Sequence, residues 1–279
     1  MKLAPDCYEC LRRLLCQAAD LATDDTSLKQ RATEEAMKIL DNEFSYSQLS
    51  IVIATKIHKI VREVTNNPDP YKAMKEREMS LARELYLELS SRYKDGFRGC
   101  LKLAAAANAI DFFREPGSVK DNIREPVRFA IDDSEQFEVK LKEAGKVLYL
   151  ADNAGELHFD LPLVKWIKQV AQVIYVVKPS AVQNDLTLED VRKSGLDGEF
   201  GKVITTGIAS PGVIFSSASA EFKQEFESAD LIFAKGMGHY EALSELTPEG
   251  KCFYCLMAKC TPVADSLGVP VNSYVALLQ

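Results

Sequence analysis

Residues 146–156 read KVLYLADNAGE, and this stretch decides the fold class. Its first half, Val147 to Leu150, is a short apolar run of residues that favour strands. Three similar runs follow, at residues 173–177, 203–205 and 231–233. Helical patterns separate them, and strands that are apolar on both faces and alternate with helices predict a mainly parallel sheet covered on both sides. We therefore interpret residues 140–279 as a three-layer α/β/α domain.

The part of the chain before this domain has a helical pattern. Leu11, Leu14, Leu15 and Ala18 recur at helical spacing, and comparable patterns continue to about residue 115. Residues 116–139 are polar, contain two prolines and a glycine, and are predicted to be a connector. The predicted fold class is α/β, with an all-helical region at 1–115 ahead of the α/β domain.

Composition limits the possible functions. The chain has 279 residues, 47% of them apolar, and a net charge of -7, which indicates a globular protein and disfavours a nucleic-acid partner. We find no apolar run long enough for a membrane span and no signal-peptide pattern at the N-terminus. Seven cysteines in a chain of this size indicate reduced thiols, so we expect a cytoplasmic protein with no membrane partner.

The second half of the opening stretch carries the first candidate ligands. Asp152 and Asn153 follow the first predicted strand directly. Carboxylate and amide oxygens suit magnesium or manganese, and ligands in open α/β sheets bind beyond the carboxyl ends of the strands. The alternative is that both residues only cap the following helix.

A second acidic position follows the next strand. Residues 184–187 read Asn-Asp-Leu-Thr, so Asp185 could supply a carboxylate from a neighbouring strand end. The same four residues also read as a turn and a helix cap. In isolation these residues favour capping, and the coincidence of acidic groups at two adjacent strand ends shifts the balance toward a metal site.

Two later turns suit an anion. Residues 206–212 are small and could present backbone N–H groups, although many such turns look alike. The fourth strand ends in Lys235-Gly236-Met237-Gly238-His239, where the glycines permit close backbone approach and the lysine brings a charge suited to phosphate. The spacing is neither that of a P-loop nor that of a dinucleotide fingerprint.

The cysteines form two groups, Cys7 with Cys10, and Cys252 with Cys255 and Cys260. They could form a second metal site or a redox site. Both groups also fall on segments with helical spacing, where they could simply be small packed residues.

Taken together, these motifs resemble the damage-control phosphatase family, formerly called domain of unknown function 89. The similarity extends over nearly the whole chain and is greatest to the stand-alone archaeal and bacterial subfamily with an N-terminal CxxC. The matching pieces are Cys7-x-x-Cys10, Asp69-Pro70-Tyr71, Asn108-x-x-Asp111, Asp152-Asn153-x-Gly155-Glu156, Asn184-Asp185-x-Thr187, Lys235-Gly236-x-Gly238 and Lys259-Cys260.

The resemblance implies a role for each of these positions. Asp152, Asn153 and Asp185 would bind the divalent metal, and Asp152, Asp185 and Lys259 would be the catalytic set. The substrate and its phosphate would contact Lys235, Gly236, Gly238, His239, Glu156, Asn108 and Asp111. The sequence departs from the family pattern at His239, where the family usually has Asn, and at Ala107, where it usually has Gly.

The functional hypothesis is therefore hydrolysis of phosphate monoesters of small metabolites with Mg, Mn, Co or Ni as cofactor. Sugar phosphates, phosphopantetheine-like compounds and nucleotides, including damaged metabolites or side products, all present the same terminal group. Two alternatives stay open: carboxyl methyl transfer from S-adenosylmethionine, and a non-enzymatic sensor that responds through metal or thiols to a phosphorylated metabolite. The sequence does not indicate the oligomeric state.

Overall fold

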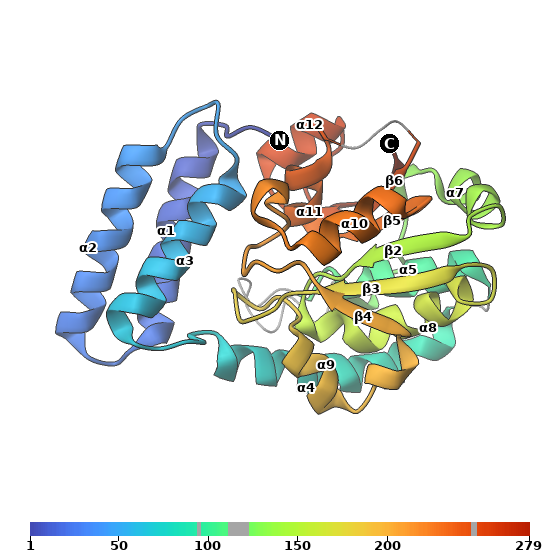
Figure 1. Ribbon diagram of the computed structural model, residues 1–279, viewed down its shortest axis with the longest axis horizontal. Helices are drawn as coiled ribbons and strands as arrows, with labels where there is room; N and C mark the ends of the chain where they lie inside the picture. The colour runs from blue at the N-terminus through green and yellow to red at the C-terminus, as the bar shows by residue number, and fades with distance from the viewer. Residues whose placement is uncertain (94–95, 111–122, 247–249) are drawn as a thin grey trace.

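The computed structural model describes residues 1–93, 96–110, 123–246 and 250–279. Its first three helices form a bundle at one end of the molecule, and the rest of the chain forms a layered α/β body (Figure 1). The bundle helices are α1 (Asp6–Ala22), α2 (Thr26–Glu43) and α3 (Ser50–Thr65). They enclose a hydrophobic core of their own that includes Leu15, Leu40 and Ile57.

The body is built on a seven-stranded sheet. Its strands are β1 (Phe129–Asp132), β2 (Lys146–Leu150), β3 (Gln172–Val177), β4 (Lys202–Thr205), β5 (Leu231–Lys235), β6 (Cys252–Ala258) and β7 (Ser273–Leu278). Their order in the sheet is β1-β7-β6-β5-β2-β3-β4. All neighbours are parallel except β6 and β7, which are antiparallel. The mainly parallel sheet predicted from the apolar runs is confirmed.

Helices cover both faces of the sheet. One face packs on α4 (Lys72–Leu89), α5 (Phe97–Ala107), α7 (Ser134–Leu141), α8 (Leu157–Ile167) and α9 (Leu188–Ser194). The other packs on α10 (Ala220–Ser228), α11 (Gly236–Leu243) and α12 (Thr261–Leu267). Successive strand residues point to opposite faces, so Tyr149 enters the first core and Leu148 the second. The predicted three-layer α/β/α architecture is therefore present.

Three strands were not anticipated from the sequence. β1 lies within the predicted connector, α7 begins in it and extends two residues beyond it, and β7 is the last strand of the sheet in chain order. β6 was expected to be helical because of its cysteine spacing, and this expectation was wrong. All seven residues of β6 are buried, so the strand shows no alternation of apolar and polar residues.

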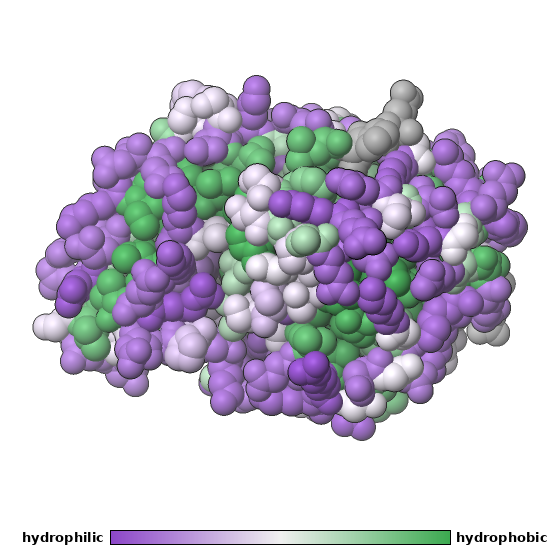
Figure 2. All heavy atoms as spheres, viewed as in Figure 1, coloured by the Kyte–Doolittle hydropathy of each residue, from purple (hydrophilic) through white to green (hydrophobic). Residues whose placement is uncertain are grey.

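The face drawn in Figure 2 is mainly hydrophilic. Among the described residues, no helix combines the length and the apolar character that a bilayer span requires.

Candidate active site

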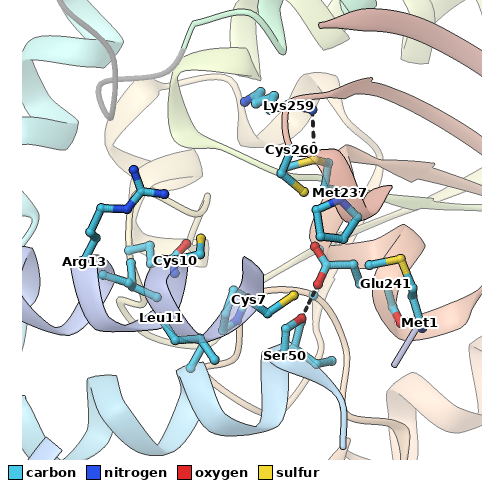
Figure 3. A pocket seen from close by; sticks show the side chains of 18 of the residues that line it. Met1, Cys7, Cys10, Leu11, Arg13, Ser50, Met237, Glu241, Lys259 and Cys260 are labelled. Atoms are coloured by element: carbon cyan, nitrogen blue, oxygen red, sulfur yellow. Dashed lines mark hydrogen bonds between the residues drawn. The ribbon is translucent and has the colours of Figure 1, made fainter. Parts of the chain in front are cut away.

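A cavity of about 730 Å³ lies between the helical bundle and the carboxyl ends of the central strands. Figure 3 shows residues of α1 and α3 facing residues of α11 and of the segment after β6 across it. The body contributes five short segments and Glu241 to the wall; the segments are Asp152–Asn153, Gln183–Asp185, Pro211–Gly212, Met237–Gly238 and Lys259–Pro262. The position agrees with the general rule for open α/β sheets.

Backbone pairing brings the segments after β2 and β3 together. Asn153 and Asp185 form an isolated antiparallel bridge. The backbone N–H of Leu186 donates to the carbonyl oxygen of Asp152 at 2.8 Å, and that of Ala154 donates to Asn184 at 2.9 Å. The two acidic positions noted in the sequence are therefore tied to each other by main-chain hydrogen bonds.

Side-chain amides orient the Asp152 carboxylate. Asn108 Nδ2 donates to Asp152 Oδ2 at 3.0 Å and to Glu156 Oε1 at 2.9 Å. Asn108 Oδ1 in turn accepts from the backbone N–H of Met257 at 2.9 Å, which fixes the orientation of the amide. Asn153 Nδ2 also donates to Glu156 Oε1, at 3.0 Å. Asn108 and Glu156 thus support Asp152 from behind and do not line the cavity.

The capping alternatives receive no support at these residues. Asn153 precedes the short 3-10 helix Ala154–Glu156, and no side-chain hydrogen bond caps that helix or the following α8. The cap of α9 is Thr187, which forms a capping box with Asp190. Asp152, Asn153 and Asp185 are therefore left for another role.

A buried lysine accompanies Asp185. Lys178 Nζ donates to the Gly212 carbonyl oxygen at 2.6 Å and lies 3.5 Å from Asp185 Oδ2. It also lies 3.4 Å from His239 Nε2. Asp185 Oδ2 is buried and accepts no hydrogen bond from the described residues. This lysine directly follows β3, and sequence reasoning did not assign it a role.

Glu78 is a second residue that the sequence did not reveal. It lies in the middle of α4, fully buried, where Asn184 Nδ2 donates to its carboxylate at 2.9 and 3.1 Å. A Cβ atom on Gly155 would lie 2.8 Å from Glu78 Cγ, so glycine is needed there for α4 to approach. A glutamate inside a helical pattern carries no signal that separates it from a solvated one.

The carboxylates are in an environment that disfavours their charge. Burial, followed by the neighbouring Glu156 and Asp185, raises the pKa of Asp152 well above its usual value, and Lys259 acts in the opposite direction. Burial raises the pKa of Asp185 to about 6, although Lys178 opposes the shift. A bound cation would offset this repulsion.

Glycine is required where β5 turns into α11. Gly236 has φ +78°, and a Cβ atom there would lie 1.9 Å from Asp152 Oδ2. A Cβ atom on Gly212 would lie 2.3 Å from the Gly238 carbonyl oxygen. The glycines thus let the backbone pack directly against the carboxylate and against the next turn. The sequence predicted a close approach of this backbone segment to phosphate, whereas the approach seen at Gly236 is to the Asp152 carboxylate.

Lys235 and His239 do not line the cavity, contrary to the expectation that they contact phosphate. Lys235 Nζ points to the opposite layer, where it donates to Asp160 Oδ1 at 2.7 Å and to the Ala104 carbonyl at 2.8 Å. It also lies 2.5 Å from Glu156 Oε2. Burial lowers the pKa of Lys235, but Asp160 and Glu156 outweigh it and the net shift is upward. The ammonium group is therefore part of a buried ion cluster.

His239 is likewise a buried structural residue. Its Nδ1 donates to the Lys235 carbonyl oxygen at 2.8 Å, which leaves Nε2 to accept from Lys178. Burial and then the Lys178 charge lower the pKa of His239 to about 3. Of the predicted phosphate contacts, Gly238 lies on the cavity wall, as does the predicted catalytic Lys259. Asp111 lies outside the described residues.

The structure groups the cysteines differently from the two groups seen in the sequence. Cys252 and Cys255 point to opposite faces of β6, into different cores, so they cannot bind one metal together. Cys7, Cys10 and Cys260 all line the cavity. In the described parts of the chain, no three His, Cys, Asp or Glu side chains are placed to hold a metal ion among themselves.

The whole chain is similar to known proteins. The family model described as the damage-control phosphatase ARMT1-like domain matches residues 3–275. The chain is 37% identical to an uncharacterised protein of Methanocaldococcus jannaschii, over 99% of this chain and 95% of the relative. It is 33% identical to a damage-control phosphatase of Archaeoglobus fulgidus, over 99% of both chains.

A further relative has a known structure. The chain is 32% identical to a damage-control phosphatase of Pyrococcus horikoshii, over 99% of this chain and 98% of the relative. The crystal structure of a DUF89 family protein from the same organism superposes with a TM-score of 0.90 and 31% identity, covering 100% of this chain and 99% of that one.

Proposed function

The chain belongs to the damage-control phosphatase family, and on that premise we propose that it is a divalent-metal-dependent phosphatase acting on monoesters of small phosphorylated metabolites. The observation that carries the proposal is the Asp152–Asp185 pair at the cavity wall, where the buried Asp185 Oδ2 has Lys178 at 3.5 Å and accepts no shorter hydrogen bond from the described residues. The names of the relatives support the reaction class, and the geometry supports the metal.

The residues present fit a hard divalent cation. Asp152, Asn153 and Asp185 offer carboxylate and amide oxygens, the donor set that Mg²⁺ and Mn²⁺ prefer. Asn153 Nδ2 is occupied by Glu156 and Asp152, so Oδ1 is the amide atom left for a ligand. When bound, such an ion supplies Lewis-acid polarisation of a phosphoryl oxygen and lowers the pKa of a coordinated water.

The remaining contributions come from the chain itself. Lys259 lines the same cavity as Asp152 and Asp185, and its ammonium group supplies a positive charge for a phosphoryl oxygen there. Asn108 and Glu156 hold Asp152 in one orientation. Residues of the bundle helices α1 and α3 form the wall of the cavity that faces this site.

The test begins with chelator-stripped protein and a panel of phosphate esters, with magnesium, manganese, cobalt or nickel added back. We expect metal-restored phosphate release that Asp152→Ala abolishes and that Asp24→Asn, a change at an exposed carboxylate, leaves intact. Circular dichroism of both variants controls for folding. Full metal-dependent activity in Asp152→Ala would refute the metal site. If no ester released phosphate, the phosphatase proposal would be wrong and the two alternatives, methyl transfer and a metabolite sensor, would be favoured.

A further inference from the structure

The cavity is much larger than a phosphate group requires. Its volume of about 730 Å³ falls within the range of sites that enclose a whole small molecule, about 300–1,000 Å³. Asp152, Asp185 and Lys259 occupy one part of its wall. The rest of the wall therefore contacts whatever is attached to the phosphate.

Helix α1 forms much of this second part. Leu11, Leu14 and Gln17 line the cavity together with Cys10 and Arg13. Figure 3 shows the Arg13 guanidinium pointing from α1 into the open part of the cavity, on the side toward Lys259. The acidic Glu241 is held elsewhere in the same view, by a hydrogen bond from Ser50.

The two neighbouring arginines of α1 differ in a way that singles out Arg13. Arg12 donates to the Glu9 carboxylate from Nε at 2.8 Å and from the second guanidinium nitrogen at 2.7 Å, and it does not line the cavity. Arg13 forms no ion pair with the described residues; its side chain contacts the Cys10 thiol at the cavity wall. A guanidinium so placed retains its charge and most of its donors for a ligand.

We propose that Arg13 is a specificity-determining residue that selects phosphate monoesters whose far end carries a second anionic group, a carboxylate or another phosphate. The inference rests on the proposed function for the position of the first phosphate. Arg13 and Lys259 lie on facing walls, so a substrate with an anion at each end contacts both. Guanidinium groups suit both anions because their fork of N–H donors matches two oxygens.

The test uses three linear hexitol derivatives with the phosphate on the same carbon. Sorbitol 6-phosphate ends in a hydroxymethyl group, 6-phosphogluconate in a carboxylate, and sorbitol 1,6-bisphosphate in a second phosphate. For the wild type we expect a lower KM for 6-phosphogluconate and the bisphosphate, whose far ends are anionic, than for sorbitol 6-phosphate. Arg13→Gln should raise those KM values about tenfold, the loss typical of one charge-assisted contact, with kcat and the KM of sorbitol 6-phosphate little changed. Comparing the KM of the bisphosphate with that of 6-phosphogluconate shows whether the site prefers a phosphate or a carboxylate.

Arg12→Gln is the matched control, since it removes the same charge from the next position of the same helix. Calorimetric titration of the metal-free protein with the same compounds gives a readout that does not need turnover. Suppose that the wild type hydrolyses nothing, yet binds the two compounds with an anionic far end more tightly than sorbitol 6-phosphate, and that Arg13→Gln removes this difference. The phosphatase proposal then fails, and the role of Arg13 in selecting the ligand stands. If hydrolysis occurs but Arg13→Gln changes all three compounds equally, or no more than Arg12→Gln does, the inference is overturned. The absence of both hydrolysis and binding overturns both.

Discussion

The α-carbon of Gly236 lies so close to the Asp152 carboxylate that a Cβ atom on it would come within 1.9 Å of Oδ2. Residues at the end of one strand thus determine how a carboxylate at the end of the neighbouring strand is held. The chain achieves this contact with a residue that has no side chain and a φ of +78°.

Gly236→Ala should therefore displace Asp152 and abolish most activity. A displacement of about 1 Å at a reacting centre costs on the order of a hundredfold in rate. Gly195→Ala is the matched control, because Gly195 also has a positive φ of +72° but has no atom within 4 Å of the added Cβ. Both variants should lose roughly 1–2 kcal/mol of stability from the left-handed backbone. Phosphate release and urea unfolding separate the two effects, and equal activity of the two variants would contradict the role given to Gly236.

Lys235 and Lys259 should have opposite mutant behaviour. Lys235 is fully buried with Asp160 and Glu156, so Lys235→Met leaves two carboxylates without their cation and should cost about 3–5 kcal/mol in unfolding free energy. Lys259→Met should leave the stability close to that of the wild type and raise the KM of a phosphate ester. Urea unfolding and steady-state kinetics of both variants check this. Our assignment is wrong if Lys235→Met is stable and specifically defective in phosphate binding.

How far the site could be predicted depends on the kind of signal each residue carries. Asp152 and Asp185 follow apolar runs, and the rule for strand ends predicts from the sequence alone that they lie together. Lys235 occupies the last position of β5, on the same face as Phe233, which points toward α8 and Asp160. The alternation of strand side chains therefore predicts that Lys235 points into this core, which conflicts with the predicted contact between Lys235 and phosphate.

Other features carried no local signal. Glu78 has the sequence environment of a solvated helical glutamate, and only packing against Gly155 reveals its burial. β6 is buried along its whole length, and an uninterrupted apolar run of this length fits a helix or a strand equally well. β1 has only four residues and alternates between half-buried and exposed positions, so it resembles a connector.

The cysteines should react with a thiol reagent in an order set by burial. Cys10 is exposed, whereas Cys252 and Cys255 are fully buried, and burial raises the pKa of each of these two to about 12. A disulfide reagent should label Cys10 in the folded protein and reach Cys252 and Cys255 only after unfolding, since the thiolate is the reactive form. Cys10→Ser should remove fast labelling that Cys252→Ser retains. Loss of a fast phase in Cys252→Ser would show that β6 opens in the native state.

His58 should make the protein less stable in acid. It is buried in α3 beside Tyr71 and Gln183, and burial, followed by the charge of Arg62, lowers its pKa from 6.5 to about 3. Between pH 6.5 and about 3, His58 is therefore protonated in the unfolded chain but stays neutral in the folded chain. The contribution of His58 to stability is constant above pH 6.5 and is lost as the pH falls from 6.5 toward 3.

At about pH 5 this loss amounts to about 2 kcal/mol for one histidine, because each pH unit below 6.5 contributes about 1.4 kcal/mol. His58→Gln keeps an acceptor for the Gln183 amide but cannot be protonated. Urea unfolding at about pH 7 and about pH 5 should show the wild type losing roughly 2 kcal/mol more than the variant. His239, whose pKa is lowered to a similar value, is present in both proteins and cancels from the comparison. Parallel losses in the two proteins would mean that His58 is protonated in the folded state, and its burial against Tyr71 would then have to be reconsidered.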